Sequence, residues 1–344
     1  MTIHIVEVSR ITPAPNSDSV LNSSNLLTIP LTFFDLPWLV FKPAKRVFFY
    51  RLIESTREQF HSFILPKLKL SLSLVLRDYL PLCDRITWDP NEPKPSIVVS
   101  KNDAVLVSIA ESDADFSIFS GYGQRPASEI HNSLPEVPVS DDSASALSLQ
   151  ITLFPGQGFS IGVAAHHGVS DGKTSTMFIK AWAHLLSNLI RVTTYELEGG
   201  YRRSRRSTTY FGNCMFPAGS YNRKTAKEFA GEGGFVTAVE ILSGLVKGFG
   251  SRKIETIDEE FKIGNDCAVV SSQFGAVAGS TQLGVYESDF WWGRPVKVDV
   301  VSIERERISM AERRDETGGI EIGMCMEKAE LDIVHALFNN GLQN

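Results

Sequence analysis

Four short apolar runs between Ser96 and His166 constrain the fold of this chain more than any other feature. The runs are SIVVS, AVLVSIA, LSLQITLF and FSIGVAAH, and Asn-Asp, Pro-Gly and other glycine-containing turns separate them. Runs rich in β-branched residues and bounded by turn residues predict the strands of a multi-stranded sheet. From Thr174 to Leu186 the chain is then apolar at the spacing of a helix with one buried face. The order of strand, turn and helix predicts an α/β protein.

Further elements are expected on both sides of this region. The segment IHIVEV from Ile3 predicts a strand, and residues Ser55 to Leu80 have helical spacing that Pro66 should break or kink. In the second half we expect a helix at AVEILSGLVKGF, strands at CAVVSSQF, VKVDVVSI and IEIGMCM, and a last helix from Glu327 to Leu337.

The length of the chain predicts two domains. Single cores stop growing near roughly 250 to 300 residues, and this chain has 344. The polar, glycine-containing and basic stretch after the helix is the best boundary. We therefore expect an N-terminal domain over residues 1–190, a linker over 191–209 and a C-terminal domain over 210–344.

Charge and cysteine content exclude several classes of function. A net charge of −6 gives no general attraction to nucleic acid or to an anionic membrane. The one basic cluster is interpreted as a solvated linker, with a localisation signal or a phosphate contact as the alternative; it comprises Arg202, Arg203, Arg205 and Arg206. The four cysteines are scattered and no signal-peptide-like start precedes them, so neither disulfides nor a zinc site is expected. No apolar run is long enough to span a bilayer. These features predict a cytosolic protein.

The sharpest local motif is HHGVSDG, from His166 to Gly172, where the last strand gives way to a helix. A histidine is suited to take a proton from a hydroxyl group at neutral pH. Glycines at 168 and 172 would allow the turn unusual backbone angles. The alternative is that either histidine is an ordinary hydrogen-bonded residue at a strand end.

Two other interpretations of this motif fail on spacing. A phosphate-binding loop needs four residues between its glycines, and only three separate Gly168 from Gly172. A metal site would use His166 and His167, but neighbouring side chains of a strand point to opposite faces. We therefore predict no metal.

Residues His167 to Gly172 resemble the HxxxDG motif of the BAHD acyl-CoA-dependent acyltransferases. Downstream, residues Asp289 to Gly293 read DFWWG and resemble the DFGWG signature of that family, in the same order. Four more segments look like the family: LTFFDLPWL, ITWDPNEPKPSI, YFGNC and SIERERISMAERRDETGGIEIG. The resemblance is to the subgroup that acts on flavonoid, anthocyanin and phenolic glucosides with malonyl-CoA or hydroxycinnamoyl-CoA.

The resemblance implies a two-domain, chloramphenicol acetyltransferase-like fold, and a channel that CoA and the acceptor enter from opposite faces. It implies His167 as the general base, acyl-CoA as co-substrate, a small glycoside as acceptor, no bound cofactor and a monomer. It also implies that Asp171 and Gly172 hold the loop, the aspartate pairing with an arginine, for which Arg203 or Arg205 is the candidate. The DFWWG residues would be structural; they are Asp289, Phe290, Trp292 and Gly293.

The chain departs from the family in three places. Trp291 stands where the family has glycine, which should strain the loop, and a PLAG-like segment reads PLCD, ending at Asp84. Roughly a hundred residues of the usual pattern have no counterpart between Leu186 and Tyr210, which would leave the second domain incomplete. The alternative function is therefore an inactive relative that binds CoA or a partner. A more distant alternative, an acyl-carrier condensing domain, should lack the DFWWG and YFGNC segments.

Overall fold

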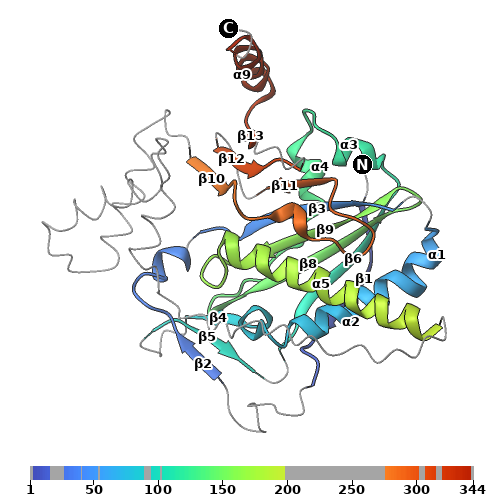
Figure 1. Cartoon of the computed structure of the whole chain (residues 1–344). Coiled ribbons are helices and arrows are strands. Elements are labelled where there is room, and N and C mark those ends of the chain that lie inside the picture. Colours follow the sequence, from blue (N-terminus) through green and yellow to red (C-terminus); the bar gives the residue numbers. More distant parts are fainter. Residues whose placement is uncertain are drawn as a thin grey trace, which may run out of the picture. The chain divides into compact units, whose positions relative to one another are not determined.

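The computed structural model describes residues 3–15, 27–39, 41–52, 55–88, 94–100, 103–197, 276–301, 307–314 and 320–341. Contacts divide the chain into two compact units, residues 1–214 with 277–344, and residues 215–276. Apart from Ala276, the second unit lies outside the described residues. The site is therefore built from elements of the first unit (Figure 1).

A six-stranded sheet forms the centre of this unit. Its order is β1 (Ile3–Ile11), β6 (Val105–Ser112), β8 (Leu147–Phe154), β9 (Gly158–Ala165), β3 (Ala44–Arg51) and β11 (Lys297–Val300). Only β6 and β8 are parallel; the other neighbours are antiparallel. All four predicted runs form strands, but the first, SIVVS, forms β5 (Ser96–Val99) of a smaller sheet. The C-terminal strand β11 pairs with β3, so a segment that we assigned to the second domain completes the first sheet.

Side chains of the central strands divide the core between the two faces of the sheet. On β3, Phe48 and Tyr50 belong to the large cluster that also contains α2 (Leu65–Val75) and α5 (Gly172–Leu197). Val47 and Phe49 face the other way, toward α3 (Phe116–Ser120) and α4 (Ala127–His131). This alternation follows from the period of two along a strand. The unit therefore has helices on both faces of its sheet.

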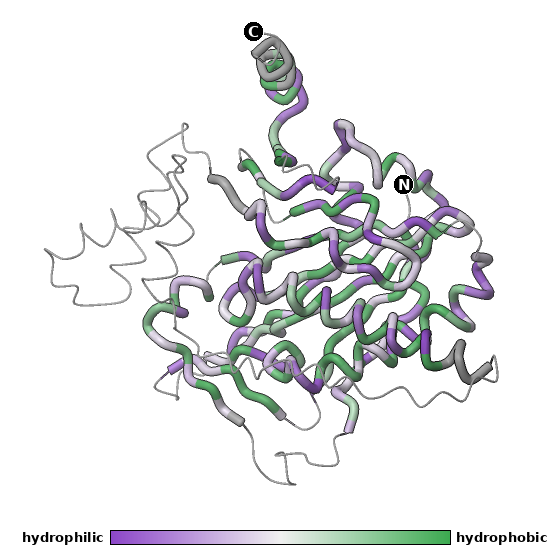
Figure 2. Tube along the Cα trace, viewed as in Figure 1, coloured by the Kyte–Doolittle hydropathy of each residue, from purple (hydrophilic) through white to green (hydrophobic). Residues whose placement is uncertain are grey.

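Helix α5 continues to Leu197, beyond the predicted end at Leu186 and into the predicted linker. The reason is that no glycine or proline follows Gly172 until Gly199. Trp182 is fully buried, and its indole Nε1 donates to the Leu68 carbonyl at 3.2 Å and to Ser71 Oγ at 3.0 Å on α2. Figure 2 shows hydrophobic and hydrophilic residues alternating along α5, as expected for a helix with one buried face.

The interruption predicted at Pro66 is confirmed. Thr56 caps a short helix α1 (Arg57–Gln59), a π-helical stretch follows (η2, Phe60–Ile64), and α2 begins at Leu65 with Pro66 in its first turn. Proline fits there because the first N–H groups of a helix have no partner within the helix.

Two smaller sheets complete the described part. One has the order β2 (Leu27–Pro30), β5 (Ser96–Val99), β4 (Arg85–Thr87), β7 (Ser143–Ser145), and the other β10 (Ala276–Ser280), β12 (Arg307–Glu312), β13 (Ile320–Cys325). Three 3₁₀ turns occur at η1 (Leu36–Leu39), η3 (Leu80–Cys83) and η4 (Val285–Glu287), and α9 (Lys328–Gly341) confirms the last predicted helix. None of the described helices has the length and apolar character needed to cross a membrane.

Three expectations fall on residues outside this description. The predicted helix AVEILSGLVKGF and strand CAVVSSQF lie there. The division into residues 1–190, 191–209 and 210–344 stays a prediction for the same reason.

Candidate active site

The loop from His166 to Asp171 connects β9 to α5 through a tight turn. The His166 N–H donates to the Ala146 carbonyl at 2.8 Å, and the His166 carbonyl accepts from Val169 at 3.0 Å and Ser170 at 3.1 Å. The first bond ties the loop to Ala146, the residue before β8, and the other two close the turn within the loop. The conformation of the loop from His166 to Asp171 is therefore fixed in part by backbone hydrogen bonds.

The glycines of the motif are needed for space, which corrects our expectation of unusual backbone angles. Neither Gly168 nor Gly172 is among the described glycines with positive φ. A Cβ on Gly168 would lie 3.1 Å from Ile86 Cδ1, and one on Gly172 would lie 3.0 Å from Arg46 Nη2. Both residues are small because other side chains pack closely against the turn.

The two histidines differ in environment. His166 is buried at 4% exposure, and its Nδ1 accepts from the Gly168 N–H at 3.1 Å. His167 is half-buried, and its ring centroid lies 5.7 Å from that of Trp38 and 6.3 Å from that of Phe41. Trp38 and Phe41 are both well exposed. His167 is thus the more exposed of the two histidines and lies beside two exposed aromatic rings.

Burial lowers the pKa of His167. The carboxylate of Asp171 opposes this shift, and the positive charge of Arg46 adds to it. The net direction is downward, so the imidazole of His167 is neutral near pH 7 and can accept a proton. Burial, and next the charge of His167, likewise lower the pKa of His166.

Asp171 is exposed, where we expected a buried carboxylate paired with an arginine. Its Oδ1 accepts from the Thr174 N–H at 2.7 Å, and its carbonyl accepts from the Ser175 N–H at 3.0 Å. This is the geometry of a helix N-cap, which satisfies an otherwise unpaired donor of α5. Arg203 and Arg205 lie outside the described residues. The role of Asp171 and Gly172 in holding the loop stays a prediction.

Arg46 is the residue near this loop that sequence analysis missed. It lies on β3, opposite Val163 of β9, and is 8% exposed. Its Nη1 donates to Thr176 Oγ1 at 2.7 Å and to the Gly172 carbonyl at 3.3 Å. The sequence did contain a signal for it. Arg46 precedes Phe48 by two residues and Tyr50 by four, so its side chain lies on the same face of the strand as these two buried residues.

The DFWWG segment packs through Phe290, which is fully buried. The Phe290 ring lies 5.0 Å from Trp182 and 5.4 Å from Tyr50, and the Trp292 ring lies 6.0 Å from Phe159. Asp289 Oδ1 accepts from the Gly293 N–H at 3.1 Å and closes the turn. These contacts attach the segment to α5 and to the central sheet.

The segment also contains the backbone strain that we predicted from its sequence. Trp291 has φ of 79°, and no other described non-glycine residue has a positive φ, while Gly293 follows at 102°. The left-handed region favours glycine, and glycine is the residue that the DFGWG signature of the family has in place of Trp291.

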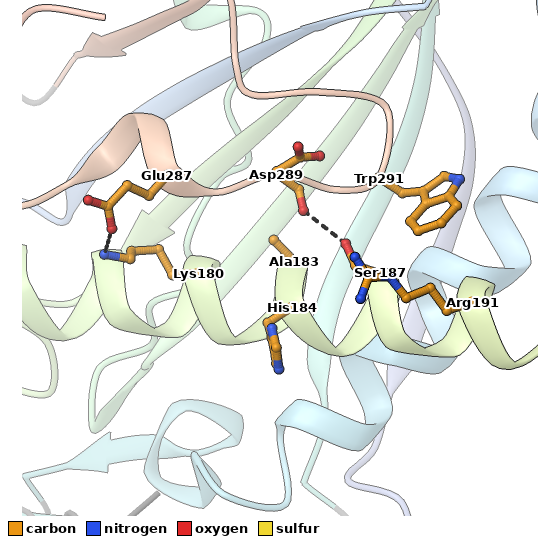
Figure 3. Close-up of a pocket in the computed structure, with 8 residues that line it drawn as sticks. All are labelled: Lys180, Ala183, His184, Ser187, Arg191, Glu287, Asp289 and Trp291. Carbon is orange, nitrogen blue, oxygen red and sulfur yellow. Dashed lines mark hydrogen bonds and ion pairs between the residues drawn. The ribbon is translucent and has the colours of Figure 1, made fainter. Parts of the chain in front are cut away.

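An open groove of about 440 Å³ lies between α5 and this segment (Figure 3). Lys180 is ion-paired with Glu287, and Ser187 Oγ donates to the Asp289 carbonyl at 3.2 Å. The lining residues are Lys180, Ala183, His184, Ser187, Arg191, Glu287, Asp289 and Trp291. Neither His167 nor Asp171 lines this groove, so it is separate from the histidine loop.

Comparison with known proteins identifies the family. Residues 1–196 match the model of the transferase family, and a BAHD acyltransferase of Arabidopsis thaliana is 36% identical, the match covering 99% of each chain. The chain belongs to the BAHD acyltransferase family. As a BAHD member it is an enzyme that transfers acyl groups, as the two motifs predicted.

Two further relatives come from the same plant. Phenolic glucoside malonyltransferase 2 is 50% identical, and the match covers 100% of each chain. Malonyl-CoA:anthocyanidin 5-O-glucoside-6''-O-malonyltransferase is 35% identical, with 99% of this chain and 98% of the relative covered. The alignment with phenolic glucoside malonyltransferase 2 spans 454 residues whereas this chain has 344. The BAHD relative therefore carries roughly a hundred residues without a counterpart here.

The fold of this BAHD protein is confirmed by a solved structure. Vinorine synthase superposes with a TM-score of 0.57 at 16% identity, covering 96% of each chain. The predicted α/β CoA-dependent acyltransferase fold is therefore correct. Within the described residues, no group of three or more His, Cys, Asp or Glu side chains is arranged to hold a metal ion.

Proposed function

We propose that this BAHD protein transfers an acyl group from acyl-CoA to a hydroxyl of a flavonoid, anthocyanin or phenolic glucoside. The acyl group is malonyl or hydroxycinnamoyl, acyl-CoA is a co-substrate, and no cofactor is bound. The enzyme acts as a monomer in the cytosol. The full-length match to a phenolic glucoside malonyltransferase at 50% identity is the observation that carries this proposal.

His167 is the general base in this mechanism. Its imidazole takes the proton of the acceptor hydroxyl, and the oxygen attacks the thioester carbonyl to form a tetrahedral intermediate. The C–S bond then breaks, the ester remains on the glucoside, and the proton passes from His167 to the CoA sulfur. A lowered pKa and partial exposure beside Trp38 and Phe41 support this role, because a base must be unprotonated and accessible.

The surroundings of the loop serve to position this base. Gly172 and Thr176 are held by Arg46, and Asp171 caps α5 directly after the loop. Fixing the base and both substrates in one site converts a bimolecular encounter into a local reaction, which is a large part of the acceleration that enzymes achieve.

Thiol release tests the proposal. The full-length protein is incubated with malonyl-CoA, with and without a phenolic glucoside, and free thiol and acylated glucoside are measured. We expect acceptor-dependent release, and His167→Ala should lower it by about 10²-fold or more. His184→Ala is the matched control, because His184 is exposed on α5 away from the loop. Equal rates for wild type and His167→Ala would exclude His167 as the base.

The alternative is a catalytically inactive relative that binds CoA or a partner. The roughly hundred residues that the malonyltransferase has and this chain lacks favour this alternative. Binding of CoA without thiol release, across a panel of acyl-CoAs and glucosides, would support it.

A further inference from the structure

One side of the Arg46 guanidinium lacks a partner. The side chain is more than nine-tenths buried, and its printed hydrogen bonds use Nη1 alone, to Gly172 and Thr176. Within the described part of the chain, nothing accepts from Nε or Nη2, and no carboxylate lies within ion-pair distance. Nε and Nη2 are not among the buried atoms that lack a partner in the described residues, so the remaining exposure of Arg46 leaves these donors within reach of solvent or of a bound anion.

The two nearest acidic groups act on Arg46 only at longer range. The charges of Glu312 and Asp171 oppose the burial that lowers the pKa of Arg46. Each carboxylate is already engaged elsewhere: Glu312 accepts from the backbone N–H groups of Leu283 and Val285, and Asp171 caps α5. The two carboxylates therefore offset part of the Arg46 charge, but neither accepts a hydrogen bond from Nη2.

The position of Arg46 places this guanidinium beside the catalytic loop. Strands β3 and β9 are antiparallel, with Ala44 opposite Ala165, so the start of β3 and the end of β9 share one end of the sheet. His167 follows that end directly. Nη2 lies against Gly172, where a Cβ would come within 3.0 Å of it. The charge of Arg46 also acts on His167.

We propose that Arg46 binds the free carboxylate of the acyl donor and thereby selects malonyl-CoA over donors with a neutral acyl group. A malonyl thioester carries its carboxylate one methylene away from the carbonyl that is attacked. A guanidinium binds carboxylates through two parallel hydrogen bonds, for which Nε and Nη2 are the available pair. Binding the carboxylate there holds the thioester carbonyl near the base. This inference rests on the proposed function and narrows its donor to a dicarboxylic acid monothioester.

Neutral acyl groups provide the contrast. An acetyl or hydroxycinnamoyl group leaves the guanidinium without its anion in the complex. A site built to bind a polar group discriminates against ligands that lack it, because the buried partner is then left unpaired. The wild-type enzyme should therefore prefer malonyl-CoA to acetyl-CoA, which has a similar size at the reacting end.

The test compares the two donors in four proteins: wild type, Arg46→Met, Arg46→Lys and Lys45→Met. Arg46→Met should slow both donors to the extent that Arg46 holds the loop, but the ratio of kcat/KM for malonyl-CoA to kcat/KM for acetyl-CoA should fall by about 10- to 150-fold, the value of a hydrogen bond to a charged group. Arg46→Lys keeps the charge but not the paired donors, so its preference for malonyl-CoA should lie between those of wild type and Arg46→Met. Lys45→Met removes a neighbouring charge of the same strand on the opposite face and should change neither donor.

Equilibrium binding of malonyl-CoA and acetyl-CoA by calorimetry separates this inference from the proposed function. Tighter binding of malonyl-CoA by wild type, lost in Arg46→Met, supports the inference even without turnover. Equal binding of both donors by wild type, or equal loss of both in Arg46→Met, overturns it. Thr176→Val, which removes an acceptor that orients Arg46 and keeps its charge, should weaken malonyl-CoA binding in the same direction and serves if Arg46→Met does not fold.

Discussion

The strained backbone at Trp291 gives a prediction whose magnitude follows from the structure. A left-handed conformation costs an L-residue roughly 1–2 kcal/mol, and φ of 79° places Trp291 there. The indole offsets part of this cost by lying 5.9 Å from the Arg191 guanidinium carbon, a contact worth about 0.5–1 kcal/mol at an exposed site. Trp291→Ala should lose the contact and keep the strain, so it should be less stable than wild type by about 0.5–1 kcal/mol.

Trp291→Gly should lose the same contact and release the strain. Glycine loses more conformational entropy on folding, about 0.5–1 kcal/mol, so the net advantage of glycine over alanine is about 1 kcal/mol. Thermal unfolding followed by circular dichroism measures it, and about 1 kcal/mol corresponds to roughly 2–4 °C in Tm for a large domain. Because both variants lack the indole, their difference isolates the backbone. An alanine variant as stable as the glycine variant would refute strain at this position.

Three further predictions concern single side chains. His167→Ala should lower kcat by about 10²- to 10⁴-fold with an unchanged Tm, whereas His166→Ala should lower Tm, because only His166 is buried and bonded within the loop. Asp171→Ala should lower the free energy of unfolding by about 1 kcal/mol in urea titrations and Asp171→Asn should not, since asparagine also caps helices; a loss of about 3–5 kcal/mol in Asp171→Ala would instead indicate a buried ion pair. Burial, and next the neighbouring Asp103, raise the pKa of Asp84 to about 9. Its folded state therefore holds a proton that the unfolded state releases near pH 4, so stability falls as pH rises from about 4 to 9, and Asp84→Asn should flatten this fall in Tm.

The local elements of the fold could be predicted because their signals are local. The strands from Ser96 to Ala165 and the break at Pro66 follow from periodicity and from one proline. The pairing of β11 with β3 could not be predicted in this way, because nothing in the period of either strand specifies a partner far along the chain. The end of α5 was placed too early because polar residues were taken as a linker where no helix-breaking residue occurs.

The candidate base follows from the motif and stays a prediction, whereas its surroundings could not be predicted from the sequence. The motif pointed to His167, and the structure adds the neighbouring rings of Trp38 and Phe41, of which Trp38 depends on how η1 packs. Asp171 was expected to be buried because the resemblance supplied a partner. Its actual bond to Thr174 is the local alternative that an aspartate before a helix offers.

Both positions where this chain replaces a family glycine carry a visible cost. Trp291 has a left-handed backbone, and Asp84 is buried with neither carboxyl oxygen accepting a well-formed hydrogen bond from a described residue. Their costs differ in kind, since one is conformational and the other is desolvation of a polar group. Sequence comparison marked both positions, and only the structure distinguishes the two mechanisms.

We expect the residues that this chain lacks to bear on substrate binding rather than on the base. Several supports of the His167 loop lie within the described residues: Ala146 accepts a hydrogen bond from it, Arg46 holds the first turn of α5, and Phe290 packs against that helix. If the missing residues form part of the acceptor site, proton transfer stays intact but the effective concentration of the hydroxyl that is to be acylated falls. Water can then take the place of the acceptor. We expect slow hydrolysis of malonyl-CoA that depends on His167 and a high KM for the glucoside, measured by thiol release with and without acceptor. A low KM for the glucoside together with no hydrolysis in its absence would contradict this reasoning, because it would require a complete acceptor site.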